Sequence, residues 1–586
     1  MTKKLFYILI ALLVLGSLFL GACAPKPAAT EEAVIEEAVV EEVVEEEAVV
    51  EEVMAEKIPL TLYYMPVSRF YYPAPKEIGE AMAADLANAG FDVQLELAGD
   101  WPTYLDIRRE GRFNGLYMLG WGSDNGDPDN FLAYFFGFAG ADKVGDDPDA
   151  WVKSPEKREG WYANTEVAKI LYAASITVGQ AEREAMYMEA EELLHEDVAR
   201  LWVAHNNTPM IFSSAVSGFV PQPVGADYYE GVTVEGFDTF VFGRGGDSVQ
   251  LDPAIVTDGE SFRVTGQVLE PLYQYEEGST TPVPALAESC TSNDAGTEWV
   301  CTLRQGVKFH DGTDFNADAV IFNFERQRFT DHPNHYDSQV YEYYEYMWGG
   351  LDDASMITSV EAVDDYTVKF VLSQPLAPFL ANIAMDIFAI SSPAAVEAAG
   401  EDYGLPSNGA VGTGPFKFVE WVEGDHITVD ANADYWGGAP GVEQIVFRVI
   451  ADDSARFLAL QAGDIDGLEQ AVVEDLAVAE ADDGFYILTK GVNTGYLAFS
   501  YNIVEFQDVR VREALAHAIN RQGLVENFLG KYGDVASTFL PPMLWGYNDS
   551  IEDWSYDPEL SRQLLAEAGF PDGLSEVTID PAFVIE

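Results

Sequence analysis

An apolar strand that runs straight into an acidic turn is the feature that most constrains this chain. Residues 117–131 read Tyr-Met-Leu-Gly-Trp-Gly-Ser-Asp-Asn-Gly-Asp-Pro-Asp-Asn-Phe, so a stretch with the composition of a buried strand ends where three carboxylates begin. Like charges this close repel one another. We therefore expect something cationic to meet the turn that holds Asp124, Asp127 and Asp129.

The residues before this turn alternate between strand and helix patterns. Leu60–Met65 has strand composition, and an apolar helical stripe follows that Gly90 ends. A second strand at 91–97, a short helix at 104–110 and a third strand at 116–120 complete the series. This alternation predicts a βαβ sheet.

Further elements are expected along the rest of the chain. A helical stripe runs from Met186 to Val198, and Asp508 and Asn520 are candidate N-caps of later helices. After Gly236 the pattern changes to strands and Gly-rich turns, which predicts a mixed α+β region. The expected strands there are Thr239–Gly243, Val300–His310 and Thr367–Leu372.

Length and charge limit the class of protein. The chain has 586 residues, more than one hydrophobic core usually serves, so two or three domains are expected. The formal net charge is -67, from 99 acidic and 32 basic residues. A nucleic-acid partner is therefore not expected, because duplex binding needs a basic face. A solvated acidic surface is the simpler interpretation of this charge.

The N-terminus has the pattern of an export signal. Lys3 and Lys4 precede an apolar run from Leu5 to Leu20, which is short for a membrane span. The following Leu20-Gly-Ala-Cys23 resembles the lipobox of bacterial lipoproteins, in which the cysteine sulfur receives a diacylglycerol. We expect a lipoprotein signal peptide at 1–23 with Cys23 as the lipidation site; an uncleaved anchor helix is the alternative.

Residues 24–57 are expected to form an acidic low-complexity linker. From Glu31 to Glu56 the sequence contains only Glu, Ala, Val, Ile and Met, with twelve glutamates. Mutual repulsion should extend such a segment. It would hold the folded part away from the membrane.

Two further cysteines, Cys290 and Cys301, flank a short polar stretch. A four-residue loop at 294–297 would pair 293 with 298, and continuing that ladder places 290 opposite 301. Direct cross-strand neighbours lie close enough for a disulfide, and an exported compartment permits it. We expect the bond; two buried thiols or a slipped register are the alternatives.

A series of segments carries a resemblance to a known family. They are Leu303–Gly312, Phe315–Val320, Gln374–Phe379, Val411–Lys417, Tyr435–Gly438, Asn493–Asn502, Val509–Leu515 and Leu540–Tyr547. From Thr239 onward the chain resembles the family 5 extracellular solute-binding proteins of ABC transporters, most closely the dipeptide-binding members. The resemblance implies an α/β, two-lobed periplasmic-binding-protein-like fold of class II with an extra domain.

The segments occur in an unusual order. In the family, the segment that ends here at Gly573 is followed by Tyr-Met-Pro-Val-x-Arg and then by Gly-Trp-x-x-Asp-Asn-Gly-Asp-Pro-Asp-Asn, which here occupy residues 60–130. The resemblance covers residues 58–579 in circularly permuted order, which joined termini permit. Ser575–Ile579 and Leu60–Tyr64 would then compete for one place in a sheet. A rearranged gene, or fragments of two tandem homologues, is the alternative.

The resemblance also implies domain boundaries. Residues 58–205 and 496–586 would form a ligand-clamping α/β lobe. Residues 206–263 and 412–495 would form the core of the first lobe. Residues 264–411 would form an additional α+β domain.

By the same resemblance, four residues would hold a small peptide. A closed cleft must neutralise both ends of a free peptide, because an unpaired buried charge is costly. Asp124 would take the ligand ammonium, and Arg69 would take the carboxylate with its bidentate fork. Trp121 and Tyr71 could line the pocket or be plain core. The alternatives are a turn-capping role for Asp124, as expected for Asp127 and Asp129, and a surface ion pair for Arg69.

Enzyme motifs are missing from the sequence, so no catalytic residues are expected. His195-Glu196 is not followed by a histidine at position 199, and no Gly-x-Ser-x-Gly elbow occurs. His332 and His335 lie in a polar stretch without a nearby ligand cluster, so neither a metal nor another cofactor is expected.

The expected role is a lipid-anchored receptor at the outer face of the cytoplasmic membrane or in the periplasm. It would pass di- or oligopeptides to an ABC permease and ATPase. A nickel-binding or haem-binding relative, a non-functional rearranged fragment, and a surface-adhesion or glycan-binding lipoprotein are the alternatives.

Overall fold

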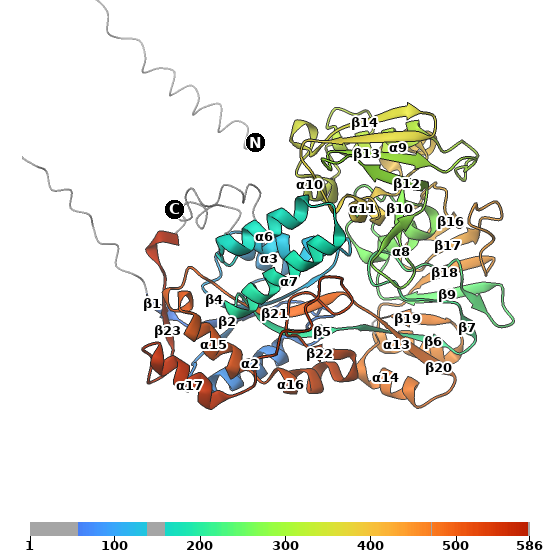
Figure 1. Cartoon of the computed structure of the whole chain (residues 1–586). Helices are drawn as coiled ribbons and strands as arrows, with labels where there is room; N and C mark the ends of the chain where they lie inside the picture. Colours follow the sequence, from blue (N-terminus) through green and yellow to red (C-terminus); the bar gives the residue numbers. More distant parts are fainter. Residues whose placement is uncertain (1–56, 138–158, 470, 584–586) are drawn as a thin grey trace, which may run out of the picture. The chain divides into compact units, whose positions relative to one another are not determined.

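The computed structural model describes residues 57–137, 159–469 and 471–583, all within one compact unit that begins at Met54 and ends at Glu586 (Figure 1). The predicted signal peptide, the lipidation site Cys23 and all of the acidic linker except Lys57 lie outside the described residues. These features therefore stay predictions.

A six-stranded sheet contains the strand that opened the sequence analysis. Its order is β22-β5-β21-β4-β2-β3. In chain order the strands are β2 (Thr61–Tyr64), β3 (Gln94–Leu97), β4 (Gly115–Gly122), β5 (Leu201–Asn206), β21 (Asn493–Phe499) and β22 (Gly533–Val535). Strand β2 is parallel to both β3 and β4, and β21 is antiparallel to β4.

Two helices connect the parallel strands, which confirms the predicted βαβ pattern. Helix α2 (Pro75–Asn88) buries Ile78, Met82 and Leu86 on one face, and Gly90 follows its end with φ 99°. This left-handed conformation favours glycine. Helix α3 (Trp101–Arg109) begins after Asp100, whose carboxylate accepts a hydrogen bond from the Thr103 N–H.

The two ends of the described chain pair with each other. Strand β1 (Lys57–Pro59) is antiparallel to β23 (Glu576–Thr578), and the two lie side by side as blue and red segments in Figure 1. The expectation that 575–579 and 60–64 compete for one place is wrong in this structure. Strand β2 holds the sheet position, while β1 gives β23 a separate partner.

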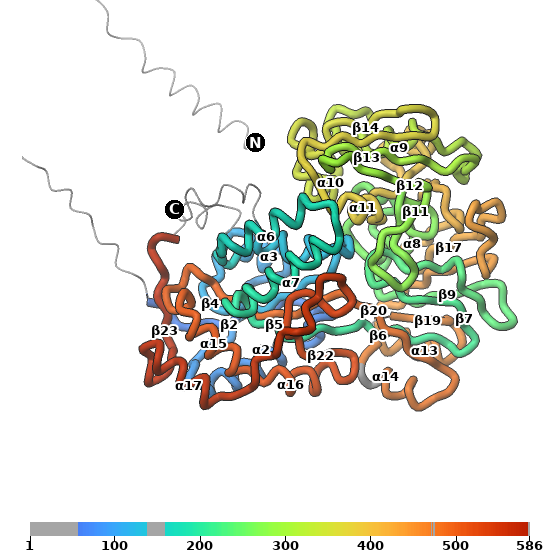
Figure 2. Tube along the Cα trace, in the orientation of Figure 1, coloured from blue at the N-terminus to red at the C-terminus, as the bar shows by residue number. Residues whose placement is uncertain are grey.

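The second large sheet has seven strands, in the order β16-β17-β18-β9-β19-β6-β20. Its strands are β6 (Thr208–Ser213), β9 (Thr239–Arg244), β16 (Phe416–Val422), β17 (His426–Ala431), β18 (Gln444–Val449), β19 (Gly467–Glu469) and β20 (Phe485–Lys490). The chain passes directly between the two sheets from β5 to β6 and from β20 to β21 (Figures 1 and 2). Two short chain segments therefore connect the two sheets.

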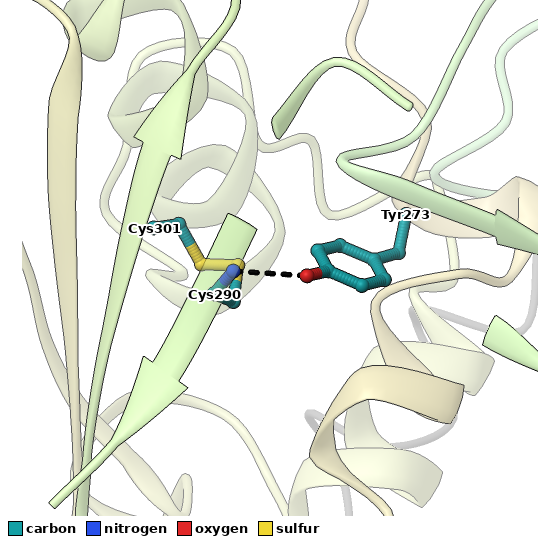
Figure 3. Close-up of a disulfide and its surroundings, with 3 residues drawn as sticks. All are labelled: Tyr273, Cys290 and Cys301. Carbon is teal, nitrogen blue, oxygen red and sulfur yellow. Dashed lines mark hydrogen bonds between the residues drawn. A yellow bond between two sulfur atoms is a disulfide. The ribbon is translucent and has the colours of Figure 1, made fainter. Parts of the chain in front are cut away.

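A four-stranded sheet, β12-β13-β15-β14, holds both described cysteines. Its strands are β12 (Ala287–Ser292), β13 (Glu298–Leu303), β14 (Ile357–Asp364) and β15 (Thr367–Leu372). Cys290 lies opposite Cys301 in the β12–β13 ladder, as the four-residue loop predicts, and a disulfide joins them (Figure 3). The Cys290 N–H donates to the hydroxyl of Tyr273, 2.9 Å away. Strand β13 ends at Leu303 rather than extending to His310.

Four short strands form two small ribbons. They are β7 (Val216–Ser217) with β8 (Thr233–Val234), and β10 (Tyr273–Tyr275) with β11 (Pro282–Pro284).

The remaining α-helices pack around these sheets. They are α4 (Pro128–Phe136), α6 (Thr165–Ile176), α7 (Gln180–Glu196), α8 (Gly259–Val268), α9 (Ala317–Arg328), α10 (Glu342–Trp348), α11 (Phe379–Asn382), α12 (Pro393–Ala399), α13 (Asp453–Ala462), α14 (Val473–Glu480), α15 (Val509–Ala518), α16 (Arg521–Leu524) and α17 (Pro558–Glu567). Asp508 and Asn520 cap α15 and α16 as predicted. Helix α7 ends at Glu196, before Val198, which has φ 43°. Within the described ranges, no helix has both the length and the apolarity to cross a bilayer.

Candidate functional site

The acidic turn lies between β4 and α4. Residues 115–120 of β4 are buried, and Gly120 lies against the ring of Tyr71, which the Cβ of any other residue would overlap. Only glycine fits at that contact. Pro128 occupies the first turn of α4, where its missing N–H costs nothing. The turn is therefore fixed at both ends.

Asp124 is half-buried and contacts only neutral donors. Its Oδ2 accepts from the Asn130 amide at 3.0 Å, and its Oδ1 accepts from the Tyr343 hydroxyl at 3.1 Å. Burial raises the pKa of the carboxyl, and these two hydrogen bonds oppose that rise. Among the described residues no cation lies within ion-pair distance of Asp124. The carboxylate can therefore accept a positive group from outside.

The two neighbouring acids have structural roles. Asp127 is the N-cap of α4 and accepts from the Asp129 N–H at 2.9 Å. Both of its oxygens also pair with the guanidinium of Arg183, at 2.9 and 2.6 Å, and both residues are buried. Asp129 accepts from the Tyr187 hydroxyl, and burial followed by the nearby charge of Asp127 raises its pKa to about 7.

A cavity of about 260 Å³ has Asp124 in its wall. The volume is slightly below the usual range for small-molecule pockets, roughly 300–1,000 Å³. Its lining includes three acids, two cations and four apolar or aromatic side chains. These are Asp124, Asp227, Asp386, Arg263, Lys490, Phe262, Tyr343, Met385 and Ile387.

The cations of this cavity are already paired with acids. The Lys490 ammonium lies 2.8 Å from Asp227, and Arg263 contacts the same carboxylate at 3.3 Å. Arg263 also pairs with the buried Glu469. Asp386 accepts from the Ala226 N–H at 2.7 Å, and burial raises its pKa to about 6. The cavity therefore favours a ligand with a positive group.

The other predicted ligand residues lie outside this lining. Arg69 is exposed, and its guanidinium lies over the ring of Trp101, 4.9 Å from the centroid. Tyr71 is buried against Gly120. Trp121 is half-buried; it stacks on Tyr134 at 4.9 Å and donates to Asn130. The structure thus does not bring Asp124 and Arg69 into one cavity, and their roles stay predictions.

Several cavity residues were not identified from the sequence. Tyr343 lies in an aromatic-rich stretch, Tyr341–Trp348, which could have suggested a binding surface. Lys490 is a lone cation at the end of the apolar strand β20, and Arg263 is a lone cation within α8. Nothing in the sequence around Asp386 indicates a place in a binding site. In the part of the chain that the structure describes, no group of three potential metal ligands occurs.

Comparison with protein families gives a clear result. The model of the bacterial extracellular solute-binding proteins, family 5, matches residues 36–143 and 281–584, which is more than half of the chain. The chain belongs to this family. The resemblance seen in the sequence and the two-lobed α/β fold agree with the assignment.

Named relatives of this family 5 protein differ in the ligands that their names state. Heme-binding protein A of Haemophilus influenzae is 37% identical over 348 residues, covering 57% of this chain and 63% of that protein. The dipeptide-binding protein of Escherichia coli is 35% identical over 349 residues, covering 58% and 64%. The chain thus spans less than two thirds of either relative. The solved structure of HbpA2 from Haemophilus parasuis matches with a TM-score of 0.50 and 30% identity, covering 57% of this chain and 67% of that one.

Proposed function

We propose that this family 5 protein is the solute-binding component of an ABC importer and that it captures di- or oligopeptides. The observation that carries the proposal is the carboxylate of Asp124, which lies in a cavity wall and contacts only neutral donors. A ligand ammonium would supply the missing positive charge. Membership of a solute-binding family supports this function over an enzyme.

Arg69 is the proposed partner of the ligand carboxylate. Its guanidinium is exposed, and within the described residues it forms no ion pair with an acid. A planar guanidinium suits a carboxylate because it offers two parallel donors. Trp121 and Tyr71 are proposed to pack beside the bound peptide. Hinge motion at the two chain crossings between the sheets would bring Asp124 and Arg69 closer together around the ligand.

Calorimetric titration with a panel of dipeptides tests this function. Asp124→Asn should weaken binding by about 100-fold or more, because the ammonium would lose the carboxylate proposed to contact it. Arg69→Gln should weaken it in the same direction, whereas the exposed controls Asp365→Asn and Arg448→Gln should leave it unchanged. If dipeptides do not bind, or bind Asp124→Asn as tightly as the unchanged protein, the proposal fails. Titration with haem and with Ni²⁺ in parallel tests the ligands of relatives.

A membrane anchor and transporter partners complete the proposed role. Cys23 would carry the lipid, so that the protein stays at the outer face of the cytoplasmic membrane or in the periplasm and docks on an ABC permease that an ATPase drives. Metabolic labelling with a clickable fatty acid should mark the protein but not Cys23→Ser. A label that persists in Cys23→Ser would contradict lipidation at this residue.

The domain boundaries and the permuted order are also proposals. The six-stranded sheet draws on residues 61–206 and 493–535, the seven-stranded sheet on 208–244 and 416–490, and the four-stranded sheet on 287–372. These sheets are our basis for a clamping lobe at 58–205 and 496–586, a first lobe at 206–263 and 412–495, and an added domain at 264–411. A reordered chain that runs 239–579 and then 60–235 should bind the same dipeptide within a few-fold. If the reordered chain bound the dipeptide and the chain in its present order did not, the present order would indicate a rearranged gene.

A further inference from the structure

A second cluster of charged side chains lies inside the clamping lobe, away from the cavity that contains Asp124. Arg108 on α3 and Arg200, which immediately precedes β5, are 5% and 3% exposed. Both guanidiniums approach one carboxylate, Glu159, at 3.6 and 3.8 Å. None of these three residues lines the Asp124 cavity.

The charges of this cluster do not balance. Each guanidinium keeps its positive charge at any physiological pH. In the described parts of the chain, Glu159 is the only acid within 4 Å of either one. Counted over the described residues, the cluster therefore carries one uncompensated positive charge. An unpaired charge at such burial costs several kcal/mol.

Several hydrogen-bond donors of this cluster also lack an acceptor among the described residues. Neither guanidinium donates a hydrogen bond to any described residue, and Nε of Arg108 and Nη1 of Arg200 are buried without a partner. The hydroxyls of Tyr117 and Tyr496 are likewise buried and unpartnered. Buried polar groups nearly always have a partner, so these donors are available to a bound group.

The strand register places the two tyrosines on one face of the sheet. Tyr117 on β4 pairs with Ala498, and Tyr496 on β21 pairs with Leu119. Residues two apart point to the same face of a sheet, so both phenol rings lie on one face. Electrostatic coupling of both tyrosines to Arg200 and Glu159 agrees with this placement.

Aromatic rings and backbone lie close to this cluster. The Arg200 guanidinium carbon lies 4.4 Å from the ring centroid of Phe135 and 5.1 Å from that of Phe136. A Cβ at Gly160 would come within 3.1 Å of the Tyr117 hydroxyl. Any group bound beside these rings must therefore be compact.

We propose that Arg108, Arg200, Tyr117 and Tyr496 form an interior binding site for one small monovalent anion, such as a halide. Guanidinium N–H groups and phenolic O–H groups are all donors, so the site offers what an anion needs. Water could accept hydrogen bonds there but could not balance the charge. The added anion would bring the net charge of the cluster to zero.

Bromide titration of the whole protein tests the proposal. At constant ionic strength, replacing gluconate by bromide should raise Tm by about 1–2 °C once bromide exceeds its Kd roughly tenfold. Arg200→Gln should abolish the rise, and it leaves Arg108 and Glu159 as a balanced pair, so folding should survive. The exposed control Arg448→Gln should keep the rise.

A second variant and a crystallographic observation make the test independent of whether Arg200→Gln folds. Tyr117→Phe retains every charge, and it should weaken bromide binding by several-fold because one donor is lost. Crystals soaked in bromide should show an anomalous peak between Arg108 and Arg200. A Tm that is equal in bromide and gluconate, or an absent peak, would overturn the assignment.

The carboxylate of a bound dipeptide is another group that could supply the negative charge to this cluster. Dipeptide affinity measured in bromide and in gluconate separates the two sources, because an interior halide site leaves that affinity unchanged. Competition between bromide and the dipeptide would overturn an independent anion site. The bromide-dependent rise in Tm and the anomalous peak do not depend on which solute the protein imports.

Discussion

The hydroxyl of Tyr343 donates a 3.1 Å hydrogen bond to Oδ1 of Asp124, although 219 positions separate the two residues in the sequence. The contact joins α10 to the turn after β4. A second buried hydrogen bond, from the Asn125 amide to Asn382 at 2.7 Å, holds the same turn. The residue proposed to bind the ligand ammonium is thus positioned by a distant part of the chain.

Loss of the Tyr343 hydroxyl should weaken peptide binding and make it more sensitive to acid. The hydroxyl stabilises the charged form of Asp124 and so opposes the rise in pKa that burial causes. In Tyr343→Phe the pKa of Asp124 should rise further. Dipeptide affinity should fall by about 3- to 10-fold at neutral pH, and the loss on acidification should begin at a higher pH.

Calorimetry at several pH values measures both effects. Tyr366→Phe, in the β14–β15 turn, provides a control because no side-chain hydrogen bond of its hydroxyl occurs in the described structure. Equal affinity and an equal pH profile for Tyr343→Phe and the unchanged protein would show that the Tyr343 hydroxyl does not stabilise the charged carboxylate of Asp124.

Local patterns in the sequence were sufficient to predict much of the six-stranded sheet and its connecting helices. The alternating strands and helices around β2, β3 and β4, and the cap at Asp508, depend on neighbours within a few residues. The place of Glu576–Thr578 was predicted wrongly, because the sequence did not show that Lys57–Pro59 could pair with it.

The partners within the candidate site were beyond sequence reasoning for a physical reason. The Tyr343 contact to Asp124 and the Lys490 contact to Asp227 span 219 and 263 positions, so no local periodicity records them. The resemblance supplied Asp124 and Arg69 as a pair. It gave no information on the cavity, which contains Asp124 without Arg69.

The buried pair of Asp127 and Arg183 should be essential for stability. Replacing Arg183 with Met would leave Asp127 as an uncompensated buried charge, which costs about 3–5 kcal/mol. Chemical denaturation should show a loss of this size. Arg448→Met, at an exposed arginine, should change the free energy of unfolding little.

A double variant separates the ion pair from the packing of the arginine. Asp127→Asn removes the charge that Arg183→Met leaves unpaired, so the double variant should lose less than the sum of the two single losses. Strict additivity would show that the two charges do not interact.

The disulfide should stabilise the four-stranded sheet. Cys290 and Cys301 are 11 positions apart, and closing a loop of this size contributes about 3 kcal/mol in the chain-entropy model. Reductant should therefore lower the unfolding midpoint of the unchanged protein. The variant with serine at both positions should unfold at that lower midpoint with or without reductant. An effect of reductant on the double-serine variant would exclude this bond as the cause.

Acidification should stabilise the folded protein through Glu191. This buried carboxyl on α7 accepts from the N–H groups of Leu540 and Asn548, and burial raises its pKa to about 8. Because the folded pKa lies above the unfolded value of 4.5, folding favours the protonated form. The contribution is complete below about pH 4.5 and is lost as the pH rises toward 8. Asp129 and Asp386, with pKa values of about 7 and 6, act in the same direction.

Unfolding free energy measured from pH 5 to 8 in Glu191→Gln tests this contribution. The unchanged protein should lose stability with a Glu191 term of at most about 1.4 kcal/mol per pH unit, and the variant should lack that term. The variant should also be less stable at pH 5, because an amide cannot accept both N–H groups. Glu189→Gln, at an exposed position on the same helix, should keep the full slope. Equal slopes in all three proteins would show that Glu191 is not protonated by folding, since a titrating group must change the slope when it is removed.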